Sequence, residues 1–284
     1  MMIDLHVHTN CSDGTLTPSE LVKRAALKEV TTVAITDHDT IAGNAEALEE
    51  GARLGVEVIP GVEVSIKIGE VGVHLLGYGL DFTTPRGLAA FNRLALAREE
   101  RLVRMVSRLN ELGAPITSKE VKQLAGGEVI GRLHIAKVMV RRGFVPNLQA
   151  AFTQYLGKRG LAYVDRERLT PIGAIEVIRG MGGVAVMAHP GVLERELGEF
   201  PEEVVKELQE LGMGGIESYY SRHSEEQTDA FNELAAKLWL FTTGGSDFHS
   251  PNPDGIELGR GYGDMRVPES CLFNLKEAIA KTRN

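Results

Sequence analysis

The sequence is short of cysteine and has no long apolar run, and each shortage excludes a class of protein. Cys11 and Cys271 are the two cysteines among 284 residues, too few for the disulfide framework of a small secreted domain. No apolar stretch reaches the roughly 18 residues that a membrane-spanning helix needs. The first residues also lack the basic, apolar and small-residue order of a signal peptide. We therefore expect a cytoplasmic protein without a membrane partner.

A positive net charge is missing as well. The chain carries 31 Lys and Arg against 39 Asp and Glu, a formal net charge of −8, which argues against a protein that coats nucleic acid or binds duplex DNA. Residues 86–168 nevertheless hold sixteen Lys and Arg against seven Asp and Glu. This basic segment is either a solvated helix surface or a lid that attracts an anionic substrate.

The chain is long enough for a full core. Its 284 residues, 43% of them apolar, can form one large α/β domain with an insertion, or two domains. Strands are predicted at residues 3–9, 30–36, 56–65, 71–78, 183–188, 215–220 and 240–243. Helices are predicted at about 18–28, 43–54, 201–211 and 224–238, and from residue 170 onward.

A purely helical stretch interrupts this alternation. Helices are predicted at about 84–113, 118–124, 133–142 and 147–156, with no strand between them. We interpret residues 99–165 as a helical insertion, a phosphate-binding lid between two parts of one α/β fold, residues 1–98 and 166–284.

The first strand carries His6 and His8. Their side chains share a face, because alternate residues of a strand point the same way. Neutral imidazole is the commonest metal ligand in proteins, so the pair can chelate one ion. A chance pair of strand histidines is the alternative.

Ligand-type side chains also stand at the ends of other predicted strands. Asp37 and His38 follow residues 30–36, His189 follows 183–188, and Asp247 and His249 follow 240–243. Polar residues at the carboxyl ends of strands in repeated βα units are typical of a barrel-like parallel sheet with its site on that face.

The full set of candidate metal ligands contains imidazoles and carboxylates but no thiolate. Such a set favours a borderline or hard divalent cation over a cysteine-type structural zinc site. The ligands outnumber the coordination positions of one ion, so we expect two or three ions that share a bridging carboxylate. The nine candidates are His6, His8, Asp13, His38, Glu63, His74, His189, Asp247 and His249.

Four ordered motifs carry a resemblance to a known family. They read HVHTNCSDG, TDHDT, GVEVS with HLLGYG, and AHPG with SDFH. With them the chain resembles the PHP (polymerase and histidinol phosphatase) superfamily of metal-dependent phosphoesterases over nearly its whole length. The resemblance implies an α/β fold, a distorted (β/α)7 TIM-like barrel with a helical insertion.

The resemblance also implies a site of three ions. One ion is expected on His6, His8, Glu63 and Asp247, a second on Glu63, His74 and His189, and a third on Asp13, His38 and His249. The carboxylate of Asp13 favours Mn²⁺, with Fe²⁺ or Zn²⁺ as alternatives.

Catalytic roles are expected for three residues near the ions. Asp37 can orient the ring of His38 or bind metal directly. His189 and His249 can protonate the leaving group if they are not fully committed to metal. The attacking group is expected to be a metal-activated hydroxide.

The insertion and the sequence Gly131-Arg132-Leu133-His134 resemble a subgroup that hydrolyses nucleoside 3′,5′-bisphosphates such as pAp. Members of this subgroup are similar to enzymes that trim short 5′-monophosphorylated RNA from its 5′ end. The resemblance implies that Arg132 and His134 bind substrate phosphate, for which a planar guanidinium is suited. A surface ion pair is the alternative for Arg132.

Arg222 and His223 are further candidates for substrate binding at the same mouth, although His223 can equally be an exposed loop residue. We therefore predict a metal-dependent phosphoesterase that removes the 3′-phosphate of nucleoside bisphosphates. A 5′–3′ exoribonuclease on short RNA, a histidinol phosphate phosphatase and a noncatalytic metal-binding module are the alternatives. The acidic body favours short substrates, since a long strand would be repelled outside the cleft.

Overall fold

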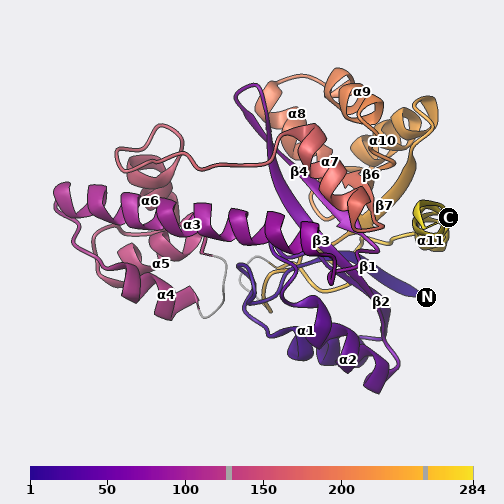
Figure 1. The fold of residues 1–284 in the computed structure, drawn as a ribbon, viewed down its shortest axis with the longest axis horizontal. Helices are drawn as coiled ribbons and strands as arrows, with labels where there is room; N and C mark the ends of the chain where they lie inside the picture. The colour runs from indigo at the N-terminus through magenta and orange to yellow at the C-terminus, as the bar shows by residue number, and fades with distance from the viewer. Residues whose placement is uncertain (126–129, 252–254, 284) are drawn as a thin grey trace.

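Seven strands form one sheet in the order of the chain, and helices surround it (Figure 1). The computed structural model describes residues 1–125, 130–251 and 255–283. The arrangement confirms the predicted distorted barrel of seven strands. The strands are β1 (Met2–Val7), β2 (Val30–Ile35), β3 (Glu57–Ile68), β4 (Val71–Tyr78), β5 (Val184–Met187), β6 (Gly215–Tyr220) and β7 (Phe241–Gly245).

Strand β4 departs from the parallel sheet that the repeated βα units predicted. It runs antiparallel to both β3 and β5, whereas the other neighbouring pairs are parallel. Only Gly69 and Glu70 separate β3 from β4. Such a short link permits only antiparallel pairing, because a parallel pair needs a crossover of about a dozen residues or more. The sheet is therefore mixed, and the prediction of a parallel sheet was wrong at β4.

Backbone contacts between β1 and the segment after β7 close the sheet. His8 donates its N–H to the carbonyl of Phe248 over 2.9 Å, and Asp247 donates to the carbonyl of His6 over 2.9 Å. Gly245 at the end of β7 permits this approach, since a Cβ there would lie 2.4 Å from the Cβ of His6. The closure places Asp247 beside the histidines of β1.

Helices cover the outside of the sheet and bury its apolar face. Val64, Leu75 and Met187 of the sheet pack with Ile175 and Phe231 of the helices in the largest apolar cluster. Helices α8 and α11 were not predicted, and α8 has just eight residues. The covering helices are α1 (Pro18–Leu27), α2 (Asn44–Leu54), α7 (Pro171–Gly180), α8 (Pro190–Leu197), α9 (Glu202–Glu210), α10 (Glu225–Lys237) and α11 (Glu269–Thr282).

The helices between β4 and α7, here called the insertion, project from the barrel (Figure 1). They are α3 (Pro85–Glu111), α4 (Ser118–Ala125), α5 (Arg132–Arg141), α6 (Leu148–Ala151) and the π-helix η1 (Phe152–Leu156). The first half of α3 packs on the barrel through Phe91 and Leu94. Its second half contributes Leu102 and Met105 to a separate apolar core. The predicted boundary at residues 98 and 99 lies inside this one helix, and the division into domains stays a prediction.

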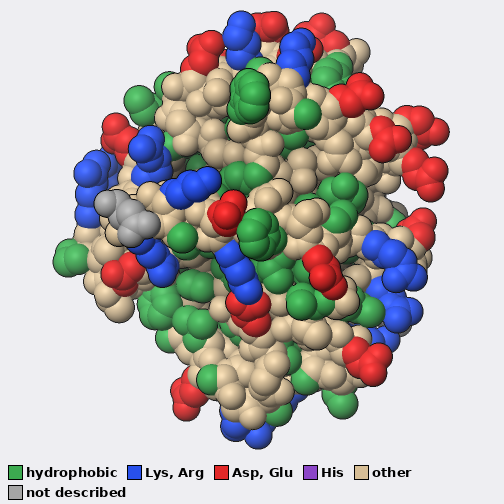
Figure 2. All heavy atoms as spheres, turned by 90° about the vertical axis from the view of Figure 1, so that its right-hand side faces the viewer, with side chains coloured by type: hydrophobic (Ala, Val, Ile, Leu, Met, Phe, Trp, Pro, Cys, Tyr) green, Lys and Arg blue, Asp and Glu red, His purple; other side chains and the backbone are tan. Residues whose placement is uncertain are grey.

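The face opposite the insertion carries apolar, acidic and basic side chains interspersed (Figure 2). Apart from the atoms drawn in grey, no histidine is in view there. Within the described residues, no helix is both long and apolar enough to cross a lipid bilayer.

Candidate metal centre and its cavity

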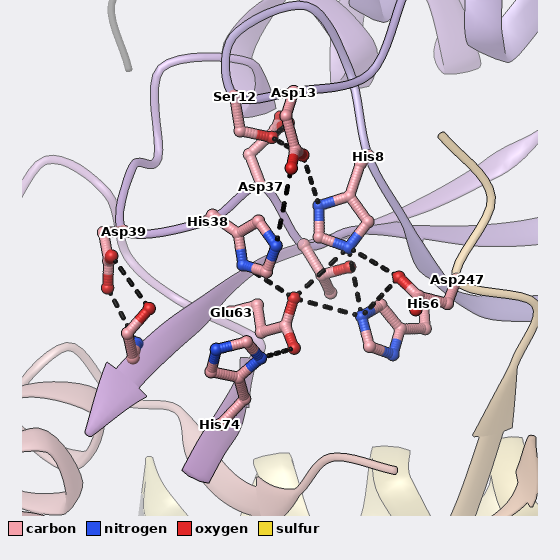
Figure 3. A network of polar contacts seen from close by, with 12 residues as sticks. His6, His8, Ser12, Asp13, Asp37, His38, Asp39, Glu63, His74 and Asp247 are labelled. Carbon is pink, nitrogen blue, oxygen red and sulfur yellow. Dashed lines mark hydrogen bonds and ion pairs between the residues drawn. The ribbon is translucent and has the colours of Figure 1, made fainter. Parts of the chain in front are cut away.

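The first group of candidate ligands converges at the end of β1. The Nε2 atoms of His6 and His8 lie 3.1 Å apart, and each lies 3.3 Å from Oε2 of Glu63. Oδ1 of Asp247 lies 3.1 Å from Nε2 of His8 and 3.6 Å from that of His6. The four side chains that the family resemblance assigned to one ion therefore direct donor atoms to one point (Figure 3).

The second group uses the other oxygen of Glu63. Oε1 lies 2.7 Å from Nδ1 of His74 and 2.9 Å from Nε2 of His189, and these two nitrogens are 3.4 Å apart. Nδ1 of His38 lies 2.9 Å from Oε2. Glu63 thus stands between two sets of imidazoles, and a carboxylate in this position can bridge two ions.

The third group forms around Asp13. Its Oδ1 lies 3.2 Å from Nε2 of His249 and 3.9 Å from Nδ1 of His8, and its Oδ2 lies 3.8 Å from Nε2 of His38. His249 donates Nδ1–H to the carbonyl of Asp247 over 2.8 Å, which leaves the lone pair of Nε2 directed toward Asp13. Eight of the nine predicted ligands fall into these three groups, in which His8 joins the third group and His38 the second. His189, the ninth, lies beside the second group through its contacts with Glu63 and His74.

Several buried nitrogen and oxygen atoms that could bind metal form no regular hydrogen bond within the described parts of the chain. Nδ1 of His8 has no hydrogen-bond partner among the described residues, although its ring is fully buried. Oε2 of Glu63 lies 2.9–3.3 Å from three imidazole nitrogens but forms no hydrogen bond of regular geometry with any of them. A buried polar atom without a partner costs free energy unless it binds something. Nitrogen and oxygen donors in such groups suit divalent cations. The residues present therefore fit a metal centre.

The carboxylates of the centre are ionised at neutral pH. Burial alone would raise the pKa of Glu63, but His38, His74 and His6 hold that pKa well below its usual value. Burial also opposes ionisation of Asp247, and His6 in turn lowers its pKa. Ionised carboxylates are the form that binds metal.

A carboxylate that was not predicted from the sequence contacts His6 of the first group. Glu217, fully buried on β6, lies 3.0 Å from Nδ1 of His6 and accepts the backbone N–H of His189 over 2.8 Å. Donation of Nδ1–H to Glu217 leaves the lone pair of His6 Nε2 directed at the other ligands, as carboxylate–histidine pairs do around metals. A single glutamate inside the otherwise uncharged strand GIESYY was the available signal.

Asp37 binds the loop after β1. Its Oδ1 accepts hydrogen bonds from the N–H of Thr9 over 2.8 Å and the hydroxyl of Ser12 over 2.5 Å, and its Oδ2 accepts from the hydroxyl of Thr9 over 2.7 Å. No hydrogen bond or ion pair joins Asp37 to His38 within the described part of the chain, so the prediction that it orients the ring of His38 is corrected. The carboxylate holds the loop that carries Asp13, and metal binding by Asp37 stays a prediction.

Three residues of the region have left-handed backbone conformations that residues with a Cβ seldom adopt. Asp39, His189 and Asp247 have φ angles of +54°, +30° and +57°, and each follows the carboxyl end of a strand. Such strain costs on the order of 1–3 kcal/mol per residue and persists where the surroundings enforce it, often at functional sites.

A cavity of about 360 Å³ connects this centre with the insertion. Asp13, His38, His74 and His189 line one side of it. We call it the cationic cavity because six basic side chains also line it, together with apolar residues and, outside the metal centre, the acidic side chain of Glu196. The basic side chains are Arg98, Arg101, Lys158, Arg166 and Arg168, together with the predicted phosphate ligand Arg132.

Asp39 neutralises two of these cations. Its buried carboxylate accepts hydrogen bonds from Arg98 and, over 2.6 Å, from Arg166. Burial alone would raise the pKa of Asp39, but Arg166 and Arg98 hold that pKa well below its usual value. The two ion pairs connect the loop after β2 to helix α3 and to the segment that follows η1.

Arg101 and Arg132 have no carboxylate partner in the described ranges. Arg101 is buried and donates Nε–H to the carbonyl of Val164 over 2.7 Å, while its Nη2 has no hydrogen-bond partner there. Burial and the neighbouring Arg132 lower the pKa of Arg101 to about 9. Arg132 donates to the carbonyl of Leu156 over 3.1 Å and lies over the ring of Phe152. The surface ion pair considered for Arg132 is therefore not formed.

His134 and His223 are occupied within the protein. Nδ1 of His134 accepts the N–H of Gly131 at the start of α5, and its side chain is buried. His223 donates Nδ1–H to the carbonyl of Ser218 over 2.9 Å and accepts the N–H of Gly191 at Nε2 over 3.1 Å. Both ring nitrogens of His223 join β6 to α8, which contradicts its predicted substrate role. His134 as a phosphate ligand stays a prediction.

Similar proteins share the sequence and the fold. The PHP domain family matches residues 4–126. A 5′–3′ exoribonuclease of Haemophilus influenzae is 37% identical over 90% of this chain and 93% of its own. A 3′,5′-nucleoside bisphosphate phosphatase of Chromobacterium violaceum is 35% identical over 90% of each chain. The structure of a candidate metal-dependent phosphoesterase from Bifidobacterium adolescentis matches with a TM-score of 0.84 and 31% identity, covering 96% of this chain and 94% of its own.

Fold and site together define a hydrolase of phosphate esters that works with metal ions. The barrel directs imidazoles and carboxylates to one centre, and a cationic cavity beside it suits a phosphorylated substrate. The chain belongs to the PHP domain family.

Proposed function

We propose that this protein removes the 3′-phosphate of nucleoside 3′,5′-bisphosphates such as pAp. The observation that carries the proposal is the pair Arg101 and Arg132, which line the same cavity as four candidate metal ligands and have no carboxylate partner in the described residues. A bisphosphate carries two phosphates on one ribose, so one can react at the centre while the arginines bind the other. The bisphosphate phosphatase relative supports this substrate class.

Some residues of the site bind metal and others bind the substrate. Divalent ions bound by the three groups supply positive charge that offsets the phosphoryl oxygens and lowers the pKa of a bound water. Arg132 grips the 5′-phosphate through its planar guanidinium. Nε2 of His189 faces Glu63, and that of His249 faces Asp13, so we place both histidines on metal and leave their proton transfer to the leaving group as a prediction.

We propose manganese as the metal. Among the described residues the centre combines six imidazoles with three carboxylates, Asp13, Glu63 and Asp247, and no thiolate. The carboxylates suit manganese, whereas imidazoles also suit iron and zinc, the alternatives. Elemental analysis of the purified protein tests the identity of the metal. In Asp13→Ala we expect the third group to lose its ion, and a full metal content in that variant contradicts the placement.

The first experiment measures manganese-supported phosphate release from pAp, with histidinol phosphate assayed in parallel. Histidinol phosphate carries a single phosphate and leaves Arg101 and Arg132 without an anion, so we expect turnover of pAp alone. If only histidinol phosphate is hydrolysed, the family stands and the proposed substrate is wrong.

Arg132→Ala tests the role of the cationic cavity. A hydrogen bond to a charged group contributes about 1.5–3 kcal/mol, so we expect KM for pAp to rise by about 10- to 100-fold. Activity on a generic aryl phosphate, which has no second phosphate, should be largely retained. Arg104→Ala, which removes an exposed arginine on α3 of the same insertion, is the control. Equal losses on both substrates in Arg132→Ala exclude a specific role.

A second candidate function is 5′–3′ trimming of short 5′-phosphorylated RNA by the same centre. The exoribonuclease relative supports it. In the structure it is favoured by a second cavity, which also borders the centre and is lined by Asp13, Asp247 and His249.

A further inference from the structure

The second cavity, of about 300 Å³, borders the metal centre on a different side from the cationic cavity. Asp247 and His249 line only this second cavity, whereas His74 and His189 line only the cationic cavity. Asp13 and Leu133 contribute to the walls of both. The candidate ligands therefore stand between two spaces, and a group bound at the centre can extend into each.

Two cations stand in the wall of the second cavity. Lys137 comes from α5 in the insertion, and Arg222 comes from the turn between β6 and α10. Neither forms an ion pair within residues 1–125, 130–251 and 255–283. Because neither cation is paired with a carboxylate there, an anionic group placed near both would be attracted.

The rest of the wall is partly apolar. Leu133, Leu148 and Ile256 line it together with the hydroxyl-bearing side chains Thr15 and Ser250. Apolar surface beside cations suits a base or ribose joined to a phosphate, because the base and sugar contact the apolar side chains while the phosphate meets the charges.

We propose that the second cavity binds the nucleotide that follows the cleaved linkage of a short 5′-phosphorylated RNA, and that Lys137 and Arg222 bind its next phosphate. This inference rests on the proposed function, because it uses the same centre and the same 5′-phosphate position at Arg132. A nucleoside bisphosphate ends at its 3′-phosphate and does not reach the second cavity. The two cations are therefore specific to RNA.

The bond that breaks determines which part of the RNA remains in the second cavity. A water oxygen bonds to the phosphorus of the first linkage, and the bond from phosphorus to O3′ of the first nucleotide breaks. O3′ takes a proton, and the first nucleotide leaves as a 5′-monophosphate. The phosphorus remains on O5′ of the shortened RNA, which then lies in the second cavity and must move forward to the cationic cavity for the next cycle.

Kinetics on substrates of different length test the proposal. We compare the manganese-loaded wild type with Lys137→Ala, Arg222→Ala and the double variant on pAp and on a 5′-phosphorylated tetranucleotide. Loss of a phosphate contact weakens binding and reduces its salt dependence. We expect kcat/KM on the tetranucleotide to fall by about tenfold in the double variant, and kcat/KM on pAp to stay within about twofold.

Binding of a non-hydrolysable analogue of the same tetranucleotide to the manganese-loaded protein, followed by fluorescence anisotropy, gives a readout without turnover. The slope of log Kd against log salt should decrease by about 0.7 for each cation removed, the value for single strands. Lys206→Ala, which removes an exposed charge on α9, is the control and should change neither slope nor kinetics.

Three outcomes overturn the inference. The variants lose activity on pAp and RNA equally, or they retain the wild-type rate and salt slope on RNA, or the wild type hydrolyses pAp but not RNA. If the wild type hydrolyses neither substrate, the proposed function itself is wrong and the inference falls with it.

Discussion

Glu63 organises the centre through its two oxygens. Oε2 faces His6, His8 and His38, and Oε1 faces His74 and His189, so one buried side chain contacts five imidazoles. Glutamate suits this position because a carboxylate can bind an ion on each oxygen while its charge offsets that of neighbouring metals. Its position on β3, beside the hairpin to β4, brings His74 to the same point.

Glu217 gives a prediction at the residue scale. In Glu217→Gln the charged acceptor for Nδ1–H of His6 is lost, so the ring and its Nε2 lone pair are held less firmly. We expect metal affinity or activity to fall by about 10- to 100-fold, as for other carboxylates behind a histidine ligand. Metal titration followed by kcat/KM on pAp measures the change. Glu207→Gln, exposed on α9, is the control, and unchanged metal affinity in Glu217→Gln contradicts the role.

At the scale of elements, one helix joins the two parts of the site. The first half of α3 packs on the barrel, and its second half contributes to the core of the insertion. Asp39, which follows β2, binds Arg98 of α3 and Arg166 beyond η1. The orientation of the cationic cavity relative to the centre therefore depends on a buried ion-pair network and not on apolar packing alone.

Asp39→Asn tests this network. Removing one member of a buried ion pair leaves an uncompensated charge, so we expect the free energy of unfolding to fall by about 3–5 kcal/mol, measured by denaturant titration. KM for pAp should rise as well, because Arg98 and Arg166 line the cavity. Glu176→Gln, in an exposed pair with Arg86, should cost little, since such pairs contribute at most about 1 kcal/mol.

The difference in free energy of unfolding between the wild type and Asp39→Asn should depend on pH in a definite direction. The pKa of Asp39 in the folded protein lies below its ordinary value of 3.8, since burial is outweighed by Arg166 and Arg98. Its contribution to stability is therefore complete above that ordinary value and is lost as the pH falls toward the folded pKa. The difference between wild type and Asp39→Asn should stay constant from pH 8 to about pH 5 and shrink below about pH 4. A difference that grows on acidification contradicts the pairing.

For the whole molecule, we expect metal binding and folding to be coupled. The closure of the barrel between β1 and β7 places Asp247 beside His6 and His8, so the same contacts that complete the sheet complete the first ligand group. Without ions, buried carboxylates and imidazoles are left with incomplete partners. Metal should therefore stabilise the entire barrel.

Chelation tests this coupling. A ligand at 100 to 1,000 times its Kd stabilises a folded protein by about 2.7–4.1 kcal/mol per site. We expect a chelator to abolish phosphate release and to lower Tm by several degrees, and manganese to restore both. Calorimetry alongside the activity assay measures the two effects together. An unchanged Tm in the presence of chelator would show that the centre binds no stabilising ion.

The sequence by itself determined the chemistry of the centre. His6 and His8 share a face by the period of a strand, and ligand-type residues follow buried β-branched strands, so strand ends and donor types were readable from local pattern. The positions of the seven strands could be predicted from the same local pattern.

The tertiary structure decided those features that depend on contacts between distant segments. The antiparallel pairing of β4 with β5, the partnership of Glu217 with His6 and the pairing of Asp39 with both arginines all join residues far apart in the chain. The placement of Arg222 and Arg132 in different cavities likewise depends on how distant elements pack. Local periodicity carries no information about such partners, because it fixes only which face a side chain takes and not what packs against that face.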